Sequence, residues 1–225
     1  QHDYSIGISK LLGEALTLTI LMADSIKLKH KLSIQIHGKG DLKLVATDYC
    51  ISPDRANPPR IRGYAKFNPS MDNNLDSVQD MMGEGYFATI LDQGYGSVPY
   101  KGISNLDKKG LAHSAQEFFL NSEQLETRFW VNIYEGFDHE GKLSLNGLGL
   151  MLQRLPNLEE MNTNAGIGKK GISLNQESFT NKILSQSNWK KIVSLLNEAS
   201  SEVISYQTDF FSDLLVKVFS DEDLR

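Results

Sequence analysis

The apolar residues change their spacing near residue 30, and this change constrains the fold more than any other feature of the chain. Residues 5–23 carry apolar side chains at helical spacing, with Leu18 and Leu21 outside the main stripe, so we expect a helix that is buried on more than one side. From residue 32 the period becomes two, because apolar residues alternate with polar ones as in a half-buried strand. The chain therefore combines a long helix with strands.

Two alternating runs, at residues 32–36 and 42–46, predict a β-hairpin. The segment between them contains Gly38 and Gly40, and short glycine-containing connections commonly join antiparallel strands. We expect both glycines to adopt positive φ angles, which other residues reach only with strain.

The rest of the chain divides into a strand-rich part and a helical part. Beside one short helix at residues 111–119, further strands are predicted at 61–67, 86–91, 98–103, 128–134 and 148–155. We therefore expect an α+β fold, in which a strand-rich, mostly antiparallel sheet body is wrapped by helices and followed by a helical C-terminal subdomain. The expected domains are a core at residues 1–156, a flexible polar connection at 157–187 and a helical linker subdomain at 188–225.

The composition limits which binding partners and which cellular compartment we expect. The 225-residue chain has a formal net charge of −5, which gives no reason to expect nucleic acid or an anionic membrane as a partner. Cys50 is the single cysteine, and one thiol forms neither an internal disulfide nor a cysteine-rich zinc site. The scarcity of cysteine, and the lack of a signal-peptide pattern in residues 1–10, favour the cytoplasm over secretion.

Local motifs for catalysis and for cofactor binding are weak. Residues 166–171 match Gly-x-Gly-x-x-Gly, but a dinucleotide site needs a strand directly before this pattern, and polar residues precede it here. No two histidines have the spacing of a helical zinc site, and no serine lies in a Gly-x-Ser-x-Gly turn. We therefore predict no catalytic, cofactor-binding or metal-binding residue and no enzyme activity. The alternative is an enzyme whose site assembles from distant residues, which would show a deep pocket with perturbed titratable groups.

One segment, residues 118–128, is more distinctive. Its pattern is typical of a helix end, a polar turn and the start of a strand. We expect its polar side chains to satisfy exposed helix carbonyls and to fix the entry of the strand, which is a structural role. These side chains belong to Ser122, Glu123, Gln124, Thr127 and Arg128.

The same segment resembles the Tyr-Phe-x-x-Ser-Glu-Gln-Leu-Pro-Thr-Arg signature of the thirty-three-kilodalton heat-shock chaperone (HslO) family. Other pieces resemble the family in the same order along nearly the whole chain, at residues 2–4, 11–16, 62–65, 83–86, 92–94, 100–102, 150–156 and 189–222. Glu126 stands where the family has proline, and the stretch from 157 to 187 is longer and more polar than in the family. We expect the family's opening strand region to be missing before Gln1, and its four zinc-binding cysteines to lie beyond Arg225.

The resemblance implies an ATP-independent, redox-regulated holdase of the cytoplasm, which binds unfolding proteins under oxidative and heat stress and prevents their aggregation. It also implies a homodimer, and zinc held by four cysteine thiolates in the full-length protein. Oxidation would form two disulfides, release the zinc and unfold the adjoining linker, since a structural zinc site supplies the folding energy of a small domain. The alternative is a constitutive protein-binding module that derives from the same core and has no redox control.

The resemblance also gives a candidate client or linker surface in the helical tail. Large apolar side chains recur there at helical spacing, and they must either pack against other residues or be exposed. The alternative is that they complete the core, and the two interpretations are compatible because a switch face is buried in the resting state. These residues are Trp189, Val193, Leu196, Phe211, Leu215 and Phe219.

Overall fold

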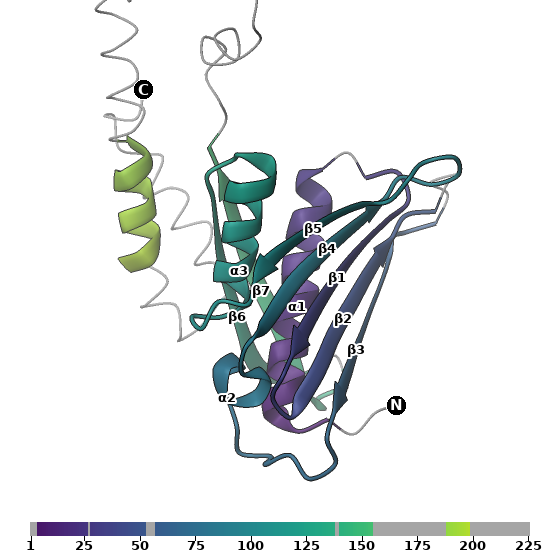
Figure 1. The fold of residues 1–225 in the computed structure, drawn as a ribbon. Helices are drawn as coiled ribbons and strands as arrows, with labels where there is room; N and C mark the ends of the chain where they lie inside the picture. Colours follow the sequence, from purple (N-terminus) through teal and green to yellow (C-terminus); the bar gives the residue numbers. More distant parts are fainter. Residues whose placement is uncertain (1–3, 27, 53–56, 138–139, 155–187, 199–225) are drawn as a thin grey trace, which may run out of the picture. The chain divides into compact units, whose positions relative to one another are not determined.

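The computed structural model describes residues 4–26, 28–52, 57–137, 140–154 and 188–198 (Figure 1). The chain divides into two compact units, Gln1–Gln153 and Arg154–Arg225, and each is described by itself. In the first unit the elements are α1 (Ile6–Ser25), β1 (Lys31–Gly38), β2 (Leu42–Cys50), β3 (Arg60–Phe67), α2 (Val78–Met82), β4 (Gly85–Asp92), β5 (Tyr100–Asn105), α3 (Leu111–Phe118), the π-helical turn η1 (Phe119–Glu123), β6 (Thr127–Phe137) and β7 (Leu143–Gln153).

Antiparallel strands form two sheets. Five strands pair in the order β3-β2-β1-β4-β5, so that β3 and β5 are the edges, and β6 and β7 form a separate two-stranded sheet. The predicted α+β fold with a mostly antiparallel, strand-rich body is confirmed. Several strands differ in extent from the prediction. β2 continues to Cys50 and β6 to Phe137, β5 begins only at Tyr100, and β7 already begins at Leu143.

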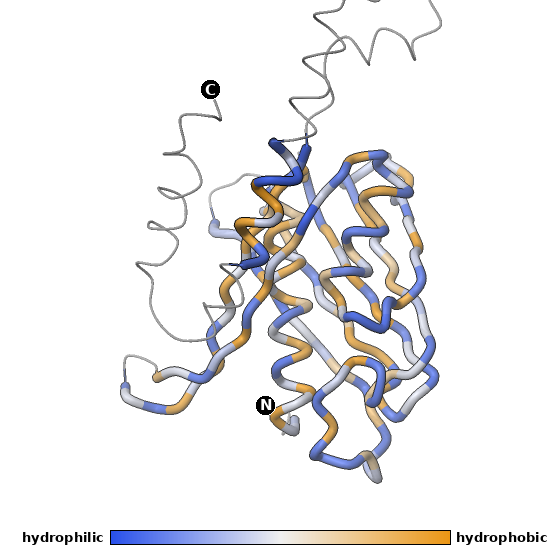
Figure 2. Tube along the Cα trace, turned by 90° about the vertical axis from the view of Figure 1, so that its left-hand side faces the viewer, coloured by the Kyte–Doolittle hydropathy of each residue, from blue (hydrophilic) through white to orange (hydrophobic). Residues whose placement is uncertain are grey.

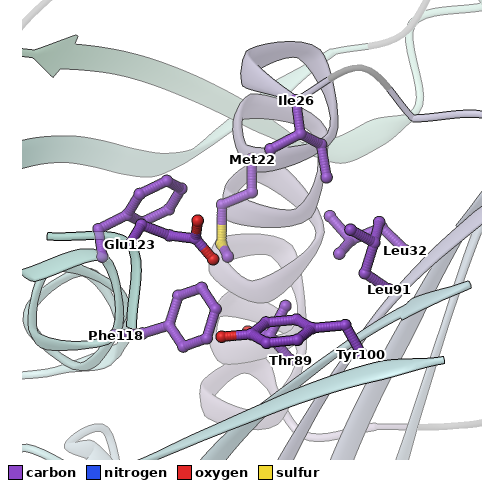
Figure 3. A pocket seen from close by; sticks show the side chains of 9 residues that line it. Met22, Ile26, Leu32, Thr89, Leu91, Tyr100, Phe118 and Glu123 are labelled. Atoms are coloured by element: carbon purple, nitrogen blue, oxygen red, sulfur yellow. The ribbon is translucent and has the colours of Figure 1, made fainter. Parts of the chain in front are cut away.

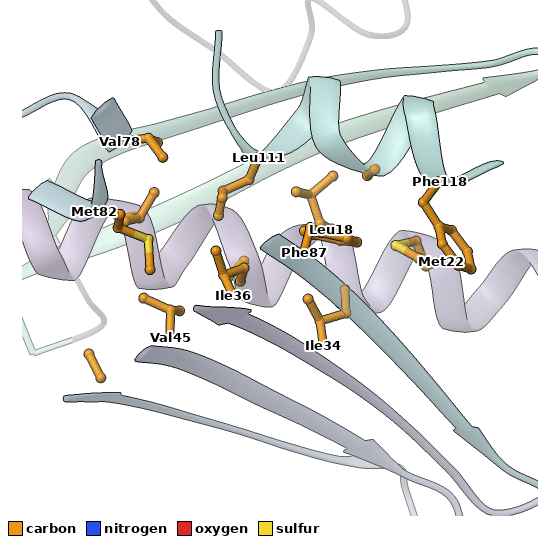
Figure 4. Packing of buried hydrophobic residues seen from close by; sticks show 14 of the residues in the cluster. Leu18, Met22, Ile34, Ile36, Val45, Val78, Met82, Phe87, Leu111 and Phe118 are labelled. Carbon is orange, nitrogen blue, oxygen red and sulfur yellow. The ribbon is translucent and has the colours of Figure 1, made fainter. Parts of the chain in front are cut away.

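Helix α1 is the centre of the core and contacts both sheets. It begins after Ser5, whose hydroxyl accepts a hydrogen bond from the N–H of Ile8. Its apolar side chains, among them Leu18 and Met22, meet the inner face of the large sheet (Figure 4). This packing on several sides is the burial that the sequence predicted for residues 5–23. The core side chains from the sheet include Ile34, Ile36, Val45 and Phe87.

The turn between β1 and β2 differs from the prediction. Gly38 and Gly40 do not have positive φ angles. A Cβ atom on Gly38 would lie 2.6 Å from the carbonyl oxygen of Met82, and one on Gly40 would lie 2.5 Å from that of Met81. The glycines are therefore explained by the close approach of α2, and not by a left-handed backbone.

Helix α1 also meets the length and composition criteria for crossing a membrane, with a mean hydropathy of 1.5. However, 44% of that stretch is buried inside the protein, and the central helix of a globular core meets the same criteria. In the second unit the described residues form a helix at 188–198. The Gly-x-Gly-x-x-Gly pattern at 166–171, the predicted connection at 157–187 and the predicted helix around Phe211 lie outside the described residues.

Candidate client-binding surfaces

The β6–β7 hairpin has two faces of different composition. Its strands pair in register, with Val131 opposite Gly149 and Trp130 opposite Leu150. Because side chains alternate along a strand, these two pairs lie on opposite faces. The face with Gly147 and Gly149 is turned toward α1, since a Cβ atom on Gly149 would meet the side chains of α1 at 2.7 Å. The glycines thus let the helix and the hairpin approach closely.

The outer face of the hairpin, which is the side turned away from α1, carries large apolar side chains, with Arg128 opposite Leu152 and Asn132 opposite Leu148. Leu148, Leu150 and Leu152 occupy alternate positions of β7, and Trp130 lies opposite Leu150 on β6. All four side chains are partly exposed. Three leucines and a tryptophan on one partly exposed strand face form the kind of patch that marks a protein-binding site. We refer to these four residues as the hairpin surface.

The tip of the hairpin is also apolar, and it projects from the rest of the unit (Figure 2). Phe137 is 75% exposed and Leu143 is 60% exposed, and the two residues are Cα partners at the end of the ladder. They face the α1 side of the hairpin but lie beyond the helix. Apolar side chains that are at least partly exposed therefore occur both at the tip of the hairpin and on the hairpin surface.

The face of the large sheet opposite α1 is more polar. Asp48 lies there, and its carboxylate accepts hydrogen bonds from the Arg62 guanidinium at 2.8 and 2.6 Å and from the Ser33 hydroxyl. Burial opposes the ionisation of Asp48, but these hydrogen bonds and the charge of Lys31 hold its pKa below the ordinary value. A surface with this ionic centre suits weakly specific apolar contacts less well than the hairpin surface. Its exposed large apolar residues are Tyr64, Tyr86 and Ile103.

The distinctive segment at 118–128 joins α3 to β6 through η1. Gln124 ends the turn with a left-handed backbone (φ 56°), and the N–H of Leu125 bonds the carbonyl of Phe119 at 3.2 Å. Thr127 is buried, and its hydroxyl donates to the carbonyl of Leu125 at 3.2 Å. Arg128 pairs with Glu126 at 3.5 Å, and Glu126 is the residue that replaces the family's proline. The segment thus sets the direction in which β6 begins.

Ser122 is partly buried and Glu123 is exposed, and both lie in η1. In the second unit, Trp189 and Leu196 are buried and Val193 is partly exposed, all within the helix at 188–198. Phe211, Leu215 and Phe219 lie outside the described residues. The structure therefore describes three of the six residues of the candidate client or linker surface in the helical tail.

Potential metal ligands do not cluster in the part of the chain that the structure describes: no three His, Cys, Asp or Glu side chains come together there. Cys50 is a free thiol at the end of β2. Burial raises the pKa of Glu14 in α1, and its carboxylate accepts a hydrogen bond from the N–H of Ala112 at 3.2 Å. This carboxylate caps the beginning of α3, and its hydrogen bonds lower the pKa against the larger effect of burial, so Glu14 has a structural role.

Comparison with known proteins gives the family. A family model described as Hsp33 protein matches residues 1–222. The chain belongs to the Hsp33 family. It is similar to the 33 kDa chaperonin of Vibrio vulnificus, with 31% identity over 181 residues that cover 80% of this chain and 55% of that protein. It is also similar to the 33 kDa chaperonin of Sodalis glossinidius, with 33% identity over 156 residues that cover 69% of this chain and 49% of that protein.

A solved structure supports the fold of this Hsp33 chain. The crystal structure of the 33 kDa chaperonin of Thermotoga maritima matches with a TM-score of 0.52 and 18% identity, covering 87% of this chain and 78% of that one. The chain spans about half the length of the curated relatives it matches. Hsp33 proteins are chaperones and not a family of enzymes. With Cys50 as its single cysteine, this chain does not supply a four-thiolate zinc site.

The hairpin surface was not predicted from the sequence. The strand at 148–155 was predicted, and the alternation of Leu148, Leu150 and Leu152 with Gly147 and Gly149 is visible in the sequence. Which of the two sets faces solvent depends on where α1 packs. The sequence does contain one signal: glycines at alternate positions, Gly147 and Gly149, indicate the strand face that another element approaches closely. The leucines would then lie on the opposite face.

Proposed function

We propose that this chain is the client-binding part of an ATP-independent, redox-regulated holdase, which binds unfolding proteins under oxidative and heat stress. The hairpin surface carries the proposal, because three alternate leucines and a tryptophan lie on a partly exposed strand face within a chaperone-family chain. Unfolding proteins expose apolar side chains, and burial of each leucine-sized group contributes about 1.5–3 kcal/mol. Such contacts need no nucleotide and no specific client sequence.

We further propose that the helical tail acts as a metastable linker. Trp189, Val193 and Leu196, together with Phe211, Leu215 and Phe219, would be covered in the resting protein and exposed after oxidation. The disulfides and the zinc of that switch require cysteines other than Cys50. The protein would act as a cytoplasmic homodimer that binds unfolded or partly unfolded clients, and neither nucleic acid nor membranes are proposed as partners.

A second candidate is a constitutive protein-binding module with the same core and no redox control. The observation that favours it is the partial exposure of the hairpin surface, which clients could reach without a preceding oxidation. The two candidates share the client surface and differ only in regulation. They are distinguished by the chaperone activity of the full-length protein before and after treatment with peroxide, which rises only if the protein is redox-regulated.

The test is light scattering of a thermally unfolding client mixed with the purified chain, without ATP. We expect suppression of aggregation near one chain per client. In the Leu150→Asp variant the same suppression should need at least about tenfold more chain, because one apolar contact is lost and a charge is introduced. The control is Ile6→Asp, which alters another exposed apolar residue, at the start of α1.

Equal suppression by Leu150→Asp and the unaltered chain, with equal thermal stability, would refute the proposed client surface. For the tail, Trp189→Ala should alter either client binding or thermal stability. A Trp189→Ala variant that leaves both unchanged would contradict a role for that face.

A further inference from the structure

A small pocket lies between the end of α1, the β4–β5 side of the large sheet and the end of α3 (Figure 3). Its volume is about 30 Å³. The walls are mainly apolar, with Met22 from α1 and Leu91 from β4, and the rings of Phe118 and Phe119 at the end of α3. The space corresponds to about one water-sized group, so it suits the end of a side chain and not a whole cofactor.

Three polar groups line this apolar pocket, one each from β4, β5 and η1. Thr89 is 3% exposed, and its hydroxyl is buried without a hydrogen-bond partner among the described residues. Tyr100 and Glu123 lie beside it, and their polar ends point into the same space (Figure 3). Within the described part of the chain, neither the Tyr100 hydroxyl nor the Glu123 carboxylate has a hydrogen bond or an ion pair. A buried hydroxyl without a partner is costly, which indicates that the pocket receives a hydrogen-bonding group.

The lining determines the chemistry of that group. A carboxylate only accepts hydrogen bonds, so its partner must be a donor, and a positively charged donor gives the stronger bond. Aromatic rings at the pocket, from Tyr100, Phe118 and Phe119, favour a cation as well. A primary ammonium group satisfies all three conditions, and it has three hydrogens for the Thr89, Tyr100 and Glu123 oxygens.

The neighbouring strand favours a polypeptide as the source of this ammonium. β5 is an edge of the sheet, and the N–H of Leu106 bonds the carbonyl of Gly85 at 3.1 Å. In an antiparallel ladder, hydrogen-bonded and non-hydrogen-bonded residue pairs alternate. Because Leu106 and Gly85 form a hydrogen-bonded pair, the N–H and C=O groups of Lys101, Ile103 and Asn105 point away from β4. These groups have no strand partner among the described residues, and they can pair with an extended segment, as in β-strand addition. Tyr100, which lines the pocket, is the first residue of the same strand.

We infer that the pocket binds the side-chain ammonium of a lysine in an extended client segment held against the edge of β5. The lysine stem would cross the mouth of the pocket beside Tyr100, which is 44% exposed, and beside the exposed Glu123. The side chain of Lys101 points to the opposite face of the sheet and leaves the pocket free. This inference rests on the proposed function and adds a preference for clients in which lysine lies within apolar, strand-forming sequence.

The experiment compares two fluorescent peptides of about eight β-branched and threonine residues, one with a central lysine and one with norleucine in its place. Norleucine keeps the apolar stem and lacks the ammonium group. We expect the chain to bind the lysine peptide about tenfold more tightly in a fluorescence anisotropy titration, the effect of about one charge-assisted hydrogen bond. Glu123→Gln should remove this preference. Glu117→Gln, on the exposed side of α3, should retain it.

Equal affinity for the two peptides, or no measurable binding of either, would overturn the inference. So would an equal loss of preference in Glu117→Gln and Glu123→Gln. Thr89→Val, which removes the buried hydroxyl, should also lower the preference while the norleucine peptide binds as before. Light scattering separates this inference from the proposed function, because a chain that suppresses aggregation without preferring lysine refutes only the pocket. A chain that prefers lysine without suppressing aggregation refutes only the holdase proposal.

Discussion

Substitutions of Glu14, which contacts the start of α3, should separate the effect of its hydrogen bond on stability from the effect of its charge. Gly110, the residue that precedes α3, provides no side-chain cap, and the Glu14 carboxylate accepts the N–H of Ala112 at 3.2 Å instead. Glu14→Ala leaves this N–H group without its acceptor. We expect a loss of about 1–2 kcal/mol in the free energy of unfolding, typical of a lost helix cap, and a fall of about 2–8 °C in Tm.

Glu14→Gln should behave differently, because it keeps an acceptor oxygen and removes the charge. Burial raises the pKa of Glu14 above the ordinary value of 4.5, against the opposing effect of the N–H groups of Ala112 and Leu111. The stability that protonation of Glu14 contributes is therefore fully present below pH 4.5, and it is lost as the pH rises through the folded-state pKa. At pH 7 we expect Glu14→Gln to be at least as stable as the unaltered chain, with the difference vanishing near pH 4.

Thermal unfolding followed by circular dichroism at several pH values tests both variants. The control is Glu117→Ala, which removes an exposed carboxylate of α3 and should change stability by no more than about 0.5 kcal/mol. Two results would refute the reasoning: a Glu14→Ala variant as stable as the unaltered chain, or a Glu14→Gln variant that loses as much stability at pH 7 as Glu14→Ala.

Two further substitutions test other parts of the unit. Asp48→Asn should lower stability at pH 7 by less than about 1 kcal/mol, because Arg62 is largely exposed and its attraction is screened. The difference should shrink as the pH falls through the lowered pKa of Asp48, and urea unfolding at pH 7 and pH 3 measures it. Gly85→Ala should cost about 1–3 kcal/mol, because its Cβ would overlap the backbone carbonyl of His37. Gly63→Ala should cost less than Gly85→Ala, because its Cβ would meet side-chain atoms of Leu12 at 2.8 Å and Leu16 at 3.3 Å and no backbone atom, and thermal unfolding of the two variants tests this order.

Periodicity was sufficient for the long elements of the fold. α1 is buried on several sides and the strands of the large sheet turn one face to the core, and both kinds of burial leave a regular apolar spacing in the sequence. α2 was missed, because five residues are too few to show a helical period. Its signal was the pair Ser77 and Asp80, since the Ser77 hydroxyl accepts the N–H of Asp80 at 3.0 Å, as at a helix start. Local sequence therefore marked the beginning of this helix even though its period was absent.

The candidate sites depended on tertiary contacts that no local pattern encodes. The hairpin surface is defined by the side of β7 that α1 leaves uncovered. The pocket brings Thr89, Tyr100 and Glu123 together from three elements, and Met22 joins them from a fourth. The sequence indicated that Glu123 belongs to a distinctive segment, but the groups that it faces are fixed only when α1, α3 and the large sheet pack together.

Site-specific crosslinking tests the central claim most directly. A photoreactive benzophenone side chain is placed at position 150, in the middle of the hairpin surface, and in a second protein at the exposed position 72, between β3 and α2. Each protein is irradiated with a thermally unfolding client and with the same client in its native state. The account predicts a crosslink at position 150 with the unfolding client alone, and little at position 72. Equal crosslinking at both positions, or crosslinking at 150 that is the same for native and unfolding client, would contradict it.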